Sequence, residues 1–187
     1  MSEVPERGKN VTGVILAAGF SRRLGRPKQL LEYRGKPLLQ WAIDTALASE
    51  LGEVLVVLGD AAPAILEQVD LGSVRVVINE RAVEGQSSSI VKAIPAADPE
   101  RDGTLLMLGD QPGLTREDMQ RVIVAFGGLP DSIAMASWQG ELRSPVVFGR
   151  DYDREMMELT GDTGARPLIM RHRDRVLAVE FDRPVPI

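Results

Sequence analysis

Hydrophobic positions along the chain form short apolar runs that alternate with stretches of helical spacing. The short runs are rich in valine, isoleucine and leucine and predict strands that are buried on both faces. They span Val11–Ala17, Val54–Leu58, Val74–Ile78, Thr104–Leu108, Ile133–Ser137, Pro145–Phe148 and Val176–Phe181. Helical spacing or helix-start residues predict helices over Pro37–Ala48, Ala62–Val69, Gln86–Ala93, Thr115–Phe126, Asp151–Leu159 and Thr163–Arg171.

Two of these helices have recognisable first turns. Pro37 suits the start of the first helix, and Thr115 is a typical N-cap with Asp118 at the third helical position. Strands that alternate with helices predict right-handed crossover connections and a mostly parallel sheet, hence the α/β class.

The chain has 187 residues, which suits one domain with one large core. We expect residues 1–10 to be a disordered leader, because they are polar and charged, and residues 11–187 to form a single domain. No run of apolar residues is long enough to span a bilayer, so we expect a cytoplasmic protein without a membrane partner.

Composition narrows the chemistry. The sequence has no cysteine and one histidine, His172, which excludes disulfides, thiolate metal sites and multi-histidine metal centres. A net charge of −5 argues against a nucleic-acid-binding protein. Carboxylates, basic side chains, backbone amides and a hard cation remain as the means of catalysis.

Basic residues are concentrated near the start of this acidic chain, which favours a small anionic ligand over a polymer. They are Arg22, Arg23, Arg26, Lys28, Arg34 and Lys36.

The loop after the first strand begins Leu16-Ala17-Ala18-Gly19 and continues through Ser21, Arg23 and Lys28. Small residues allow a ligand to approach the backbone, and the loop glycines allow successive amides to point at an anion. Arg23 and Lys28 would add charge-assisted hydrogen bonds to phosphate. An ordinary strand-to-helix turn with solvated arginines has similar glycines, but the basic cluster favours phosphate. The loop is neither a Walker sequence nor a G-x-G-x-x-G turn.

A second candidate site follows the fourth strand, at Gly109-Asp110-Gln111-Pro112. In an open α/β sheet, ligands bind at the carboxyl ends of the strands, where Asp110 would lie beside the phosphate loop. Mg²⁺ takes one or two carboxylates and completes its shell with water and phosphate oxygens. A turn aspartate that caps local amides is the alternative.

Two polar helix starts come next. Asn79 follows the third strand, and Gly85 precedes three serines, Ser87 to Ser89, whose hydroxyls and amides suit a phosphate or polar substrate. The segment Gly161–Arg166 could bring Asp162 or Arg166 near a ligand. Plain helix capping would produce either pattern.

Taken together, these motifs resemble the molybdenum-cofactor cytidylyltransferase type of nucleotidyltransferase. The loop Leu16–Lys28 matches the signature L-A-A-G-x-S-x-R-x-G-x-x-K, and "NERAVEGQSSSI", "GDQP", "SPVVF" and "LTGDTGARPL" follow in the family's order. The resemblance implies a three-layer α/β/α, Rossmann-like fold of nucleotide-diphospho-sugar transferase type. It also implies that molybdopterin phosphate attacks the α-phosphorus of CTP, or less typically GTP, and releases pyrophosphate.

The resemblance also implies roles for residues, with Mg²⁺ as the cofactor and a molybdoenzyme of the xanthine dehydrogenase kind as a partner. Lys28, Arg23 and Asp110 would be catalytic, with Asp110 as the metal ligand. The nucleotide would contact Leu16, Ala17, Ala18, Gly19, Ser21, Arg23, Lys28, Asn79, Gly85, Ser88 and Ser89. The acceptor would contact Gln111, Pro112, Asp162 and Arg166.

The sequence departs from the family pattern in two places. Ser144-Pro145 stands where the family usually has His-Pro, so a histidine contact to the acceptor is missing. The family also has a terminal Asp-x-Asp-Thr motif, and the sequence reaches Ile187 where that motif would begin. The resemblance therefore accounts for one acidic metal ligand, Asp110.

Two other functions stay open from the sequence. Some proteins that resemble this family are assigned to NAD(P)H-dependent reduction of a dye-like nicotine metabolite, although the phosphate loop lacks the dinucleotide signature. A non-catalytic nucleotide- or pterin-binding partner for the maturation of a molybdoenzyme would have the same motifs.

Overall fold

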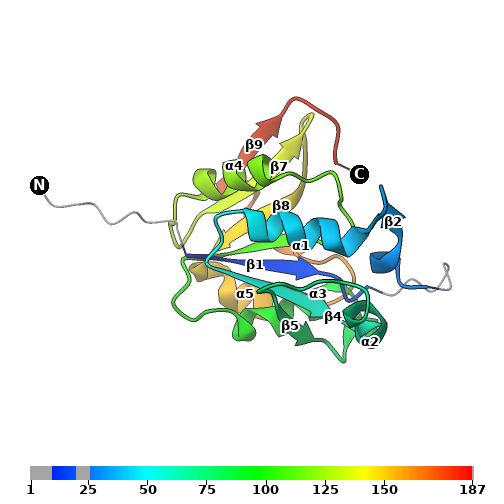
Figure 1. The fold of residues 1–187 in the computed structure, drawn as a ribbon. Coiled ribbons are helices and arrows are strands. Elements are labelled where there is room, and N and C mark those ends of the chain that lie inside the picture. Colours follow the sequence, from blue (N-terminus) through cyan, green and yellow to red (C-terminus); the bar gives the residue numbers. More distant parts are fainter. Residues whose placement is uncertain (1–9, 20–25, 187) are drawn as a thin grey trace, which may run out of the picture.

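In the computed structural model of this chain, the described residues are 10–19 and 26–186, and they contain a seven-stranded sheet (Figure 1). Its strands are β1 (Val11–Leu16), β4 (Glu53–Leu58), β5 (Arg75–Ile78), β6 (Gly103–Leu108), β7 (Ile133–Trp138), β8 (Glu141–Gly149) and β9 (Val176–Phe181). The order is β5-β4-β1-β6-β8-β7-β9. All neighbouring pairs are parallel except those of β8, which confirms the predicted mostly parallel sheet.

The direction of β8 follows from its connection to β7. Only Gln139 and Gly140 lie between the two strands, and their φ angles are 51° and 84°. A two-residue loop joins antiparallel strands, and positive φ at both positions is the conformation that matches the strand twist. The sequence predicts the two strands but not the hairpin that joins them.

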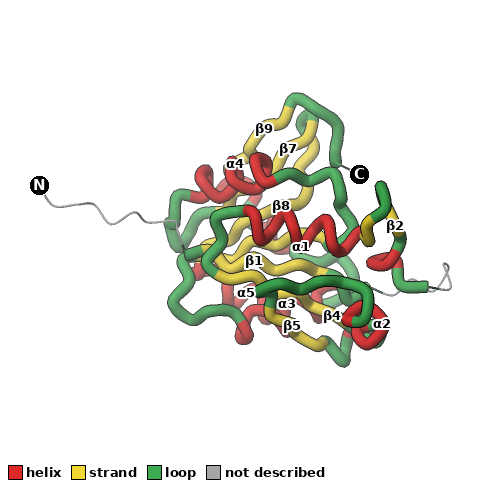
Figure 2. The backbone as a smooth tube through the Cα atoms, viewed as in Figure 1, coloured by secondary structure: helices red, strands yellow, loops and turns green. Residues whose placement is uncertain are grey.

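Helices cover both faces of the sheet, so the predicted three-layer α/β/α fold is confirmed (Figure 2). They are α1 (Leu38–Ala48), α2 (Ala62–Leu66), α3 (Gln86–Ala93), α4 (Arg116–Phe126), α5 (Asp153–Met157) and α6 (Arg166–Arg171). Short 3₁₀ segments are η1 (Lys28–Leu30), η2 (Ala82–Glu84), η3 (Ile94–Ala96), η4 (Arg150–Tyr152) and η5 (Arg173–Arg175). A small hairpin of β2 (Glu32–Tyr33) and β3 (Lys36–Pro37) precedes α1.

Two hydrophobic clusters fill the space between the layers. Successive residues of a strand point to opposite faces, so Ile15 of β1 belongs to the cluster beneath α1 and α4, and Val14 to the cluster beneath α3, α5 and α6. Leu39 and Phe126 are fully enclosed in the first cluster, and Ile90 in the second. Burial of β1 on both faces explains its continuous apolar sequence.

Local signals located most helix starts well. Thr115 and Asp118 form the predicted capping box at α4, with the Thr115 hydroxyl accepting from the Asp118 amide and the Asp118 carboxylate accepting from the Thr115 amide. The last two helices are shorter than predicted: α5 follows a 3₁₀ turn, and α6 begins just before Pro167. No helix in the described ranges has the length and apolar character needed to cross a membrane.

Candidate functional site

The end of β1 is held by hydrogen bonds from three sides. The Ala17 amide donates to the Val57 carbonyl (3.0 Å), and the Gly109 amide donates to the Leu16 carbonyl (3.0 Å). The buried Gln29 side chain donates through Nε2 to the carbonyls of Ala17 (2.6 Å) and Gly19 (3.3 Å). These bonds order the start of the predicted phosphate loop; its later members Ser21 and Arg23 lie outside the described residues.

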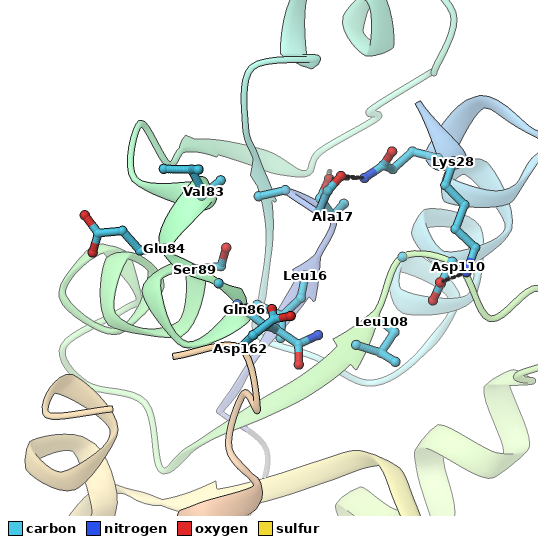
Figure 3. Close-up of a pocket in the computed structure, with 16 residues that line it drawn as sticks. Leu16, Ala17, Lys28, Val83, Glu84, Gln86, Ser89, Leu108, Asp110 and Asp162 are labelled. Carbon is cyan, nitrogen blue, oxygen red and sulfur yellow. Dashed lines mark hydrogen bonds and ion pairs between the residues drawn. The ribbon is translucent and has the colours of Figure 1, made fainter. Parts of the chain in front are cut away.

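Lys28 and Asp110 meet across the carboxyl ends of β1 and β6, as the order of the strands requires. The Lys28 Nζ lies 2.6 Å from Asp110 Oδ2, and both side chains are partly exposed (Figure 3). Lys28 is the first residue of η1, which carries it over the end of the sheet. A cation and a carboxylate are thus paired where a polyphosphate and its counter-ion could bind.

The start of α3 is fastened to the loop that precedes α6. Asp162 Oδ1 accepts from the Gln86 amide (3.1 Å), and the Ser87 amide donates to the Gly161 carbonyl (3.1 Å). Gly85 makes this approach possible: a Cβ there would lie 2.5 Å from the Gly161 carbonyl oxygen. Two segments more than 70 residues apart therefore act as one wall.

Asn79 holds the first turn of α3 in place through its side chain. It is almost fully buried, and its Nδ2 donates to the hydroxyls of Ser88 (2.8 Å) and Ser89 (3.0 Å). The Ser88 hydroxyl also donates to backbone carbonyls, to that of Gly85 at 2.7 Å. Asn79 and Ser88 thus brace α3, and Ser89 reaches the cavity.

These elements enclose a first cavity of about 520 Å³ (Figure 3). Its lining contains the predicted residues Leu16, Ala17, Ala18, Gly19, Lys28, Gly85, Ser89, Asp110 and Asp162. It also contains residues for which the sequence predicts no individual role: Gln29, Ala82, Val83, Glu84, Gln86, Leu108 and Gly109. Glu84 pairs with Arg81, and this hydrogen bond lowers the pKa of the Glu84 carboxyl.

A second cavity of about 630 Å³ adjoins the first and shares Leu16, Gln86 and Leu108 with it. The predicted acceptor residues Gln111 and Arg166 line it, together with Arg143, Ser144 and Arg173. Gln111 Oε1 and Ser144 Oγ are buried and lack a hydrogen-bond partner among the described residues.

The structure separates the four residues predicted for the acceptor. Gln111 and Arg166 line the second cavity, Asp162 lines the first, and Pro112 belongs to the lining of neither. Asp162 belongs to the first cavity because it caps α3. No local signal distinguishes a residue that caps another helix from one that caps its own.

Some cavity-lining residues have no sequence pattern of their own that would predict a role in the site. Gln29 directly follows Lys28, and Gln86 lies between Gly85 and the serines, so both were inside motifs already noticed. Arg143 and Arg173 are isolated in sequence, and only the fold brings them together.

A family model described as the MobA-like NTP transferase domain matches residues 13–176. The chain belongs to this family. The resemblance drawn from the motifs is thereby confirmed, and this MobA-like protein has a domain of the nucleotidyltransferase type.

Individual relatives of this MobA-like protein carry different names. Nicotine blue oxidoreductase of Paenarthrobacter nicotinovorans is 38% identical over 160 residues, which cover 85% of this chain and 74% of the relative. The crystal structure of an Rv0371c homologue from Mycobacterium sp. strain JC1 is 36% identical, with a TM-score of 0.86, and covers 96% of this chain and 89% of that one. Rv0371c of Mycobacterium tuberculosis H37Rv in complex with manganese is 31% identical, with a TM-score of 0.81 and coverages of 95% and 92%.

Proposed function

We propose that this protein transfers CMP from CTP to a phosphorylated acceptor of the molybdopterin type and releases pyrophosphate. The observation that carries the proposal is the pair of adjoining cavities, which share a wall at Leu16, Gln86 and Leu108. In nucleotidyl transfer, the two substrates must meet at one phosphorus atom. Two adjoining cavities that share lining residues suit that requirement.

The first cavity suits the nucleoside triphosphate. Ala17, Ala18 and Gly19 are small enough for the nucleotide to lie close to the backbone, and Lys28 supplies positive charge. In the reaction, an acceptor phosphate oxygen forms a bond to the α-phosphorus, and the bond from that phosphorus to the bridging oxygen of pyrophosphate breaks. Lys28 would stabilise the negative charge that develops on the departing pyrophosphate.

The second cavity suits an anionic acceptor with a hydrogen-bonding edge. Arg143, Arg166 and Arg173 line it, and guanidinium groups bind phosphate through paired hydrogen bonds. Gln111 and Ser144 add polar side chains to the same lining. Where the family usually has histidine, Ser144 could supply a hydroxyl contact.

A divalent cation fits the Asp110 site in the chemistry of its donors. Asp110 is the carboxylate that would hold it, and within the described ranges no three histidine, cysteine or acidic side chains gather as a metal cluster. Mg²⁺ accepts such a site when phosphate oxygens and water complete its shell. When bound, it would neutralise charge on the polyphosphate. The manganese in the complex of Rv0371c supports a divalent ion of this class.

Pyrophosphate release and nucleotide binding test the proposal together. Wild-type protein should be stabilised by CTP with Mg²⁺ in a thermal-shift panel of nucleotides, and it should release pyrophosphate when the molybdopterin-type acceptor is added. Asp110→Asn should lose most of its turnover. Asp60→Asn is a matched control, because Asp60 follows β4 but does not belong to the lining of either cavity. Stabilisation without pyrophosphate release would support the binding partner, and no stabilisation by any triphosphate would exclude the transferase.

An NAD(P)H-dependent oxidoreductase is the second candidate, because a relative of 38% identity is named nicotine blue oxidoreductase. Against it, Ala17-Ala18-Gly19 follows β1 in place of the G-x-G-x-x-G turn that binds dinucleotides. Saturable NADPH binding without any binding of triphosphate would favour this candidate over the transferase.

A further inference from the structure

The segment that follows β9, residues 182–186, is attached to the rest of the protein at two points. The chain turns back after β9 (Figure 1), and Arg183 is the first point of attachment. Its guanidinium donates to Oδ2 of Asp118, whose side chain is 6% exposed, and its Cζ lies 4.8 Å from the centroid of the Trp138 ring. Val185 is the second, because it is partly buried and packs against the hydrophobic cluster beneath α1 and α4.

The two partners of Arg183 are themselves held in place. Asp118 accepts from the Thr115 amide at 2.8 Å in the capping box of α4. Trp138 is 1% exposed, and its ring stacks on that of Phe181 with centroids 4.2 Å apart. A charged hydrogen bond is stronger than a neutral one, and the face of an indole ring attracts a cation. Arg183 therefore ties the segment to α4 and to β7.

Val185 also forms part of the wall of the second cavity. Among residues 182–186, all of which lie in the described range, only Val185 lines this cavity. The wall has other apolar side chains, including Ile90, Leu142 and Ile169, in addition to the arginines that suit a phosphate. Apolar side chains in a binding site pack against the uncharged surface of a ligand and exclude water from it.

The position of Val185 depends on that of Arg183. Val185 lies between Pro184 and Pro186, so Pro184 alone separates the two attached residues. A proline ring fixes φ at about −65° and restricts the residue before it. The segment is therefore stiff, and a displacement of Arg183 would move Val185 out of the wall.

We propose that Val185 contacts the uncharged part of the acceptor and that Arg183 is the positioning residue that holds Val185 there. Arg183 does not line the second cavity, so it acts on the acceptor through Val185. Because the acceptor cavity belongs to the proposed function, this role rests on that proposal. It adds to the cavity an apolar wall from the segment after β9.

The kinetics of pyrophosphate release, with CTP, Mg²⁺ and molybdopterin as the acceptor, test both residues. Val185→Ala removes two methyl groups and should raise the KM for the acceptor about fivefold, the order expected for lost apolar contact. Arg183→Met keeps an unbranched side chain without the charge and should raise the same KM by a similar factor. In both variants, kcat and the dissociation constant for CTP should stay at wild-type values, because neither residue lines the first cavity.

The double variant Arg183→Met/Val185→Ala distinguishes a positioning role from two independent roles. If Arg183 acts through Val185, the KM of the double variant should equal that of Arg183→Met, because the displaced Val185 side chain no longer contributes. Independent effects would multiply to about 25-fold.

Arg121→Met is the matched control. Arg121 Cζ lies 4.2 Å from the centroid of the Phe181 ring, and the guanidinium donates to the Glu180 carbonyl at 2.7 Å. Arg121 thus contacts the end of β9 much as Arg183 contacts the segment beyond it, and it lines neither the first cavity nor the second. This variant should keep the wild-type KM for the acceptor.

An unchanged KM in Val185→Ala would overturn the contact, and this variant keeps the pairing of Arg183 with Asp118 that favours folding. Multiplied effects in the double variant would overturn the positioning role, as would an equal rise of the KM in Arg121→Met. A matching loss of CTP affinity would assign the segment to general stability and overturn the proposal. In each of these cases wild type still releases pyrophosphate, whereas no release by wild type would overturn the proposed function together with this role.

Discussion

Gly85→Ala tests how closely α3 and the loop before α6 must approach each other. Gly85 has φ of 108° and ψ of 175°, a combination that is available almost exclusively to glycine. A Cβ at this position would lie 2.5 Å from the Gly161 carbonyl oxygen and 2.7 Å from Asp162 Cα. Both neighbours are backbone atoms, so neither can rotate away.

The expected cost has two parts. Holding a non-glycine residue in this region of backbone conformation costs about 1–3 kcal/mol. Forcing a methyl group into occupied space costs about another 1–3 kcal/mol. The free energy of unfolding should therefore fall by roughly 2–6 kcal/mol, and the melting temperature by roughly 2–4 °C for each kcal/mol in a protein of this length. CTP affinity should fall too, because Gln86 and Asp162 line the first cavity.

Urea unfolding measures the free energy of unfolding, and isothermal titration calorimetry measures the affinity for CTP. Gly161→Ala separates the two contributions: Gly161 also has positive φ, 81°, but a Cβ there would meet nothing within 4 Å. This control should show the conformational cost with little steric cost. If Gly85→Ala loses no more stability than Gly161→Ala, the close approach of the two segments has no energetic importance and the reasoning fails.

Three further predictions concern the scaffold. Thr115→Ala removes the N-cap of α4 and should lower the free energy of unfolding by about 1 kcal/mol in urea titrations. Thr115→Ser keeps a hydroxyl and should retain most of the wild-type stability. Equal stability of all three proteins would contradict the capping role. Arg101 is buried and pairs with Asp153 at 2.6 Å, so Arg101→Met should cost about 3–5 kcal/mol by the same assay, and a smaller loss in the Asp153→Asn background would confirm the pairing. Hydrogen bonds from His172, then Arg171, lower the pKa of the Glu155 carboxyl below its ordinary 4.5. The stabilisation that Glu155 contributes is therefore present above pH 4.5 and is lost as the pH falls through the lowered pKa. Glu155→Gln should flatten the acid limb of a curve of stability against pH, and an unchanged limb would refute this linkage.

The fold class could be predicted because it depends on short-range patterns. Apolar runs such as Val11–Ala17 indicate strands covered on both faces, and the Thr115 capping box indicates where α4 begins. The hairpin between β7 and β8 could not be placed as easily, because Gln139-Gly140 is not a characteristic turn pair. Its positive φ angles are apparent only in the structure.

The candidate site could be predicted where one segment contains its residues. The phosphate loop, Lys28 and Asp110 follow buried strands, and parallel strands bring their carboxyl ends to one edge. Contacts between remote segments could not be predicted, because the local sequence shows which side chains are polar or charged but not which remote residues they contact. Asp162 caps α3 across 76 residues, and Arg143 and Arg173 converge on the second cavity only through the fold.

The sequence by itself therefore determined the layers, the candidate phosphate loop and the nucleotidyltransferase family, since each depends on neighbours along the chain. Tertiary structure decided the division into two cavities, the placement of Asp162 in the first and the orientation of the Gln29 amide. Each of these depends on atoms brought together by packing of the sheet and helices. Local chemistry can name the candidates for a site, but only packing decides which of them face the same space.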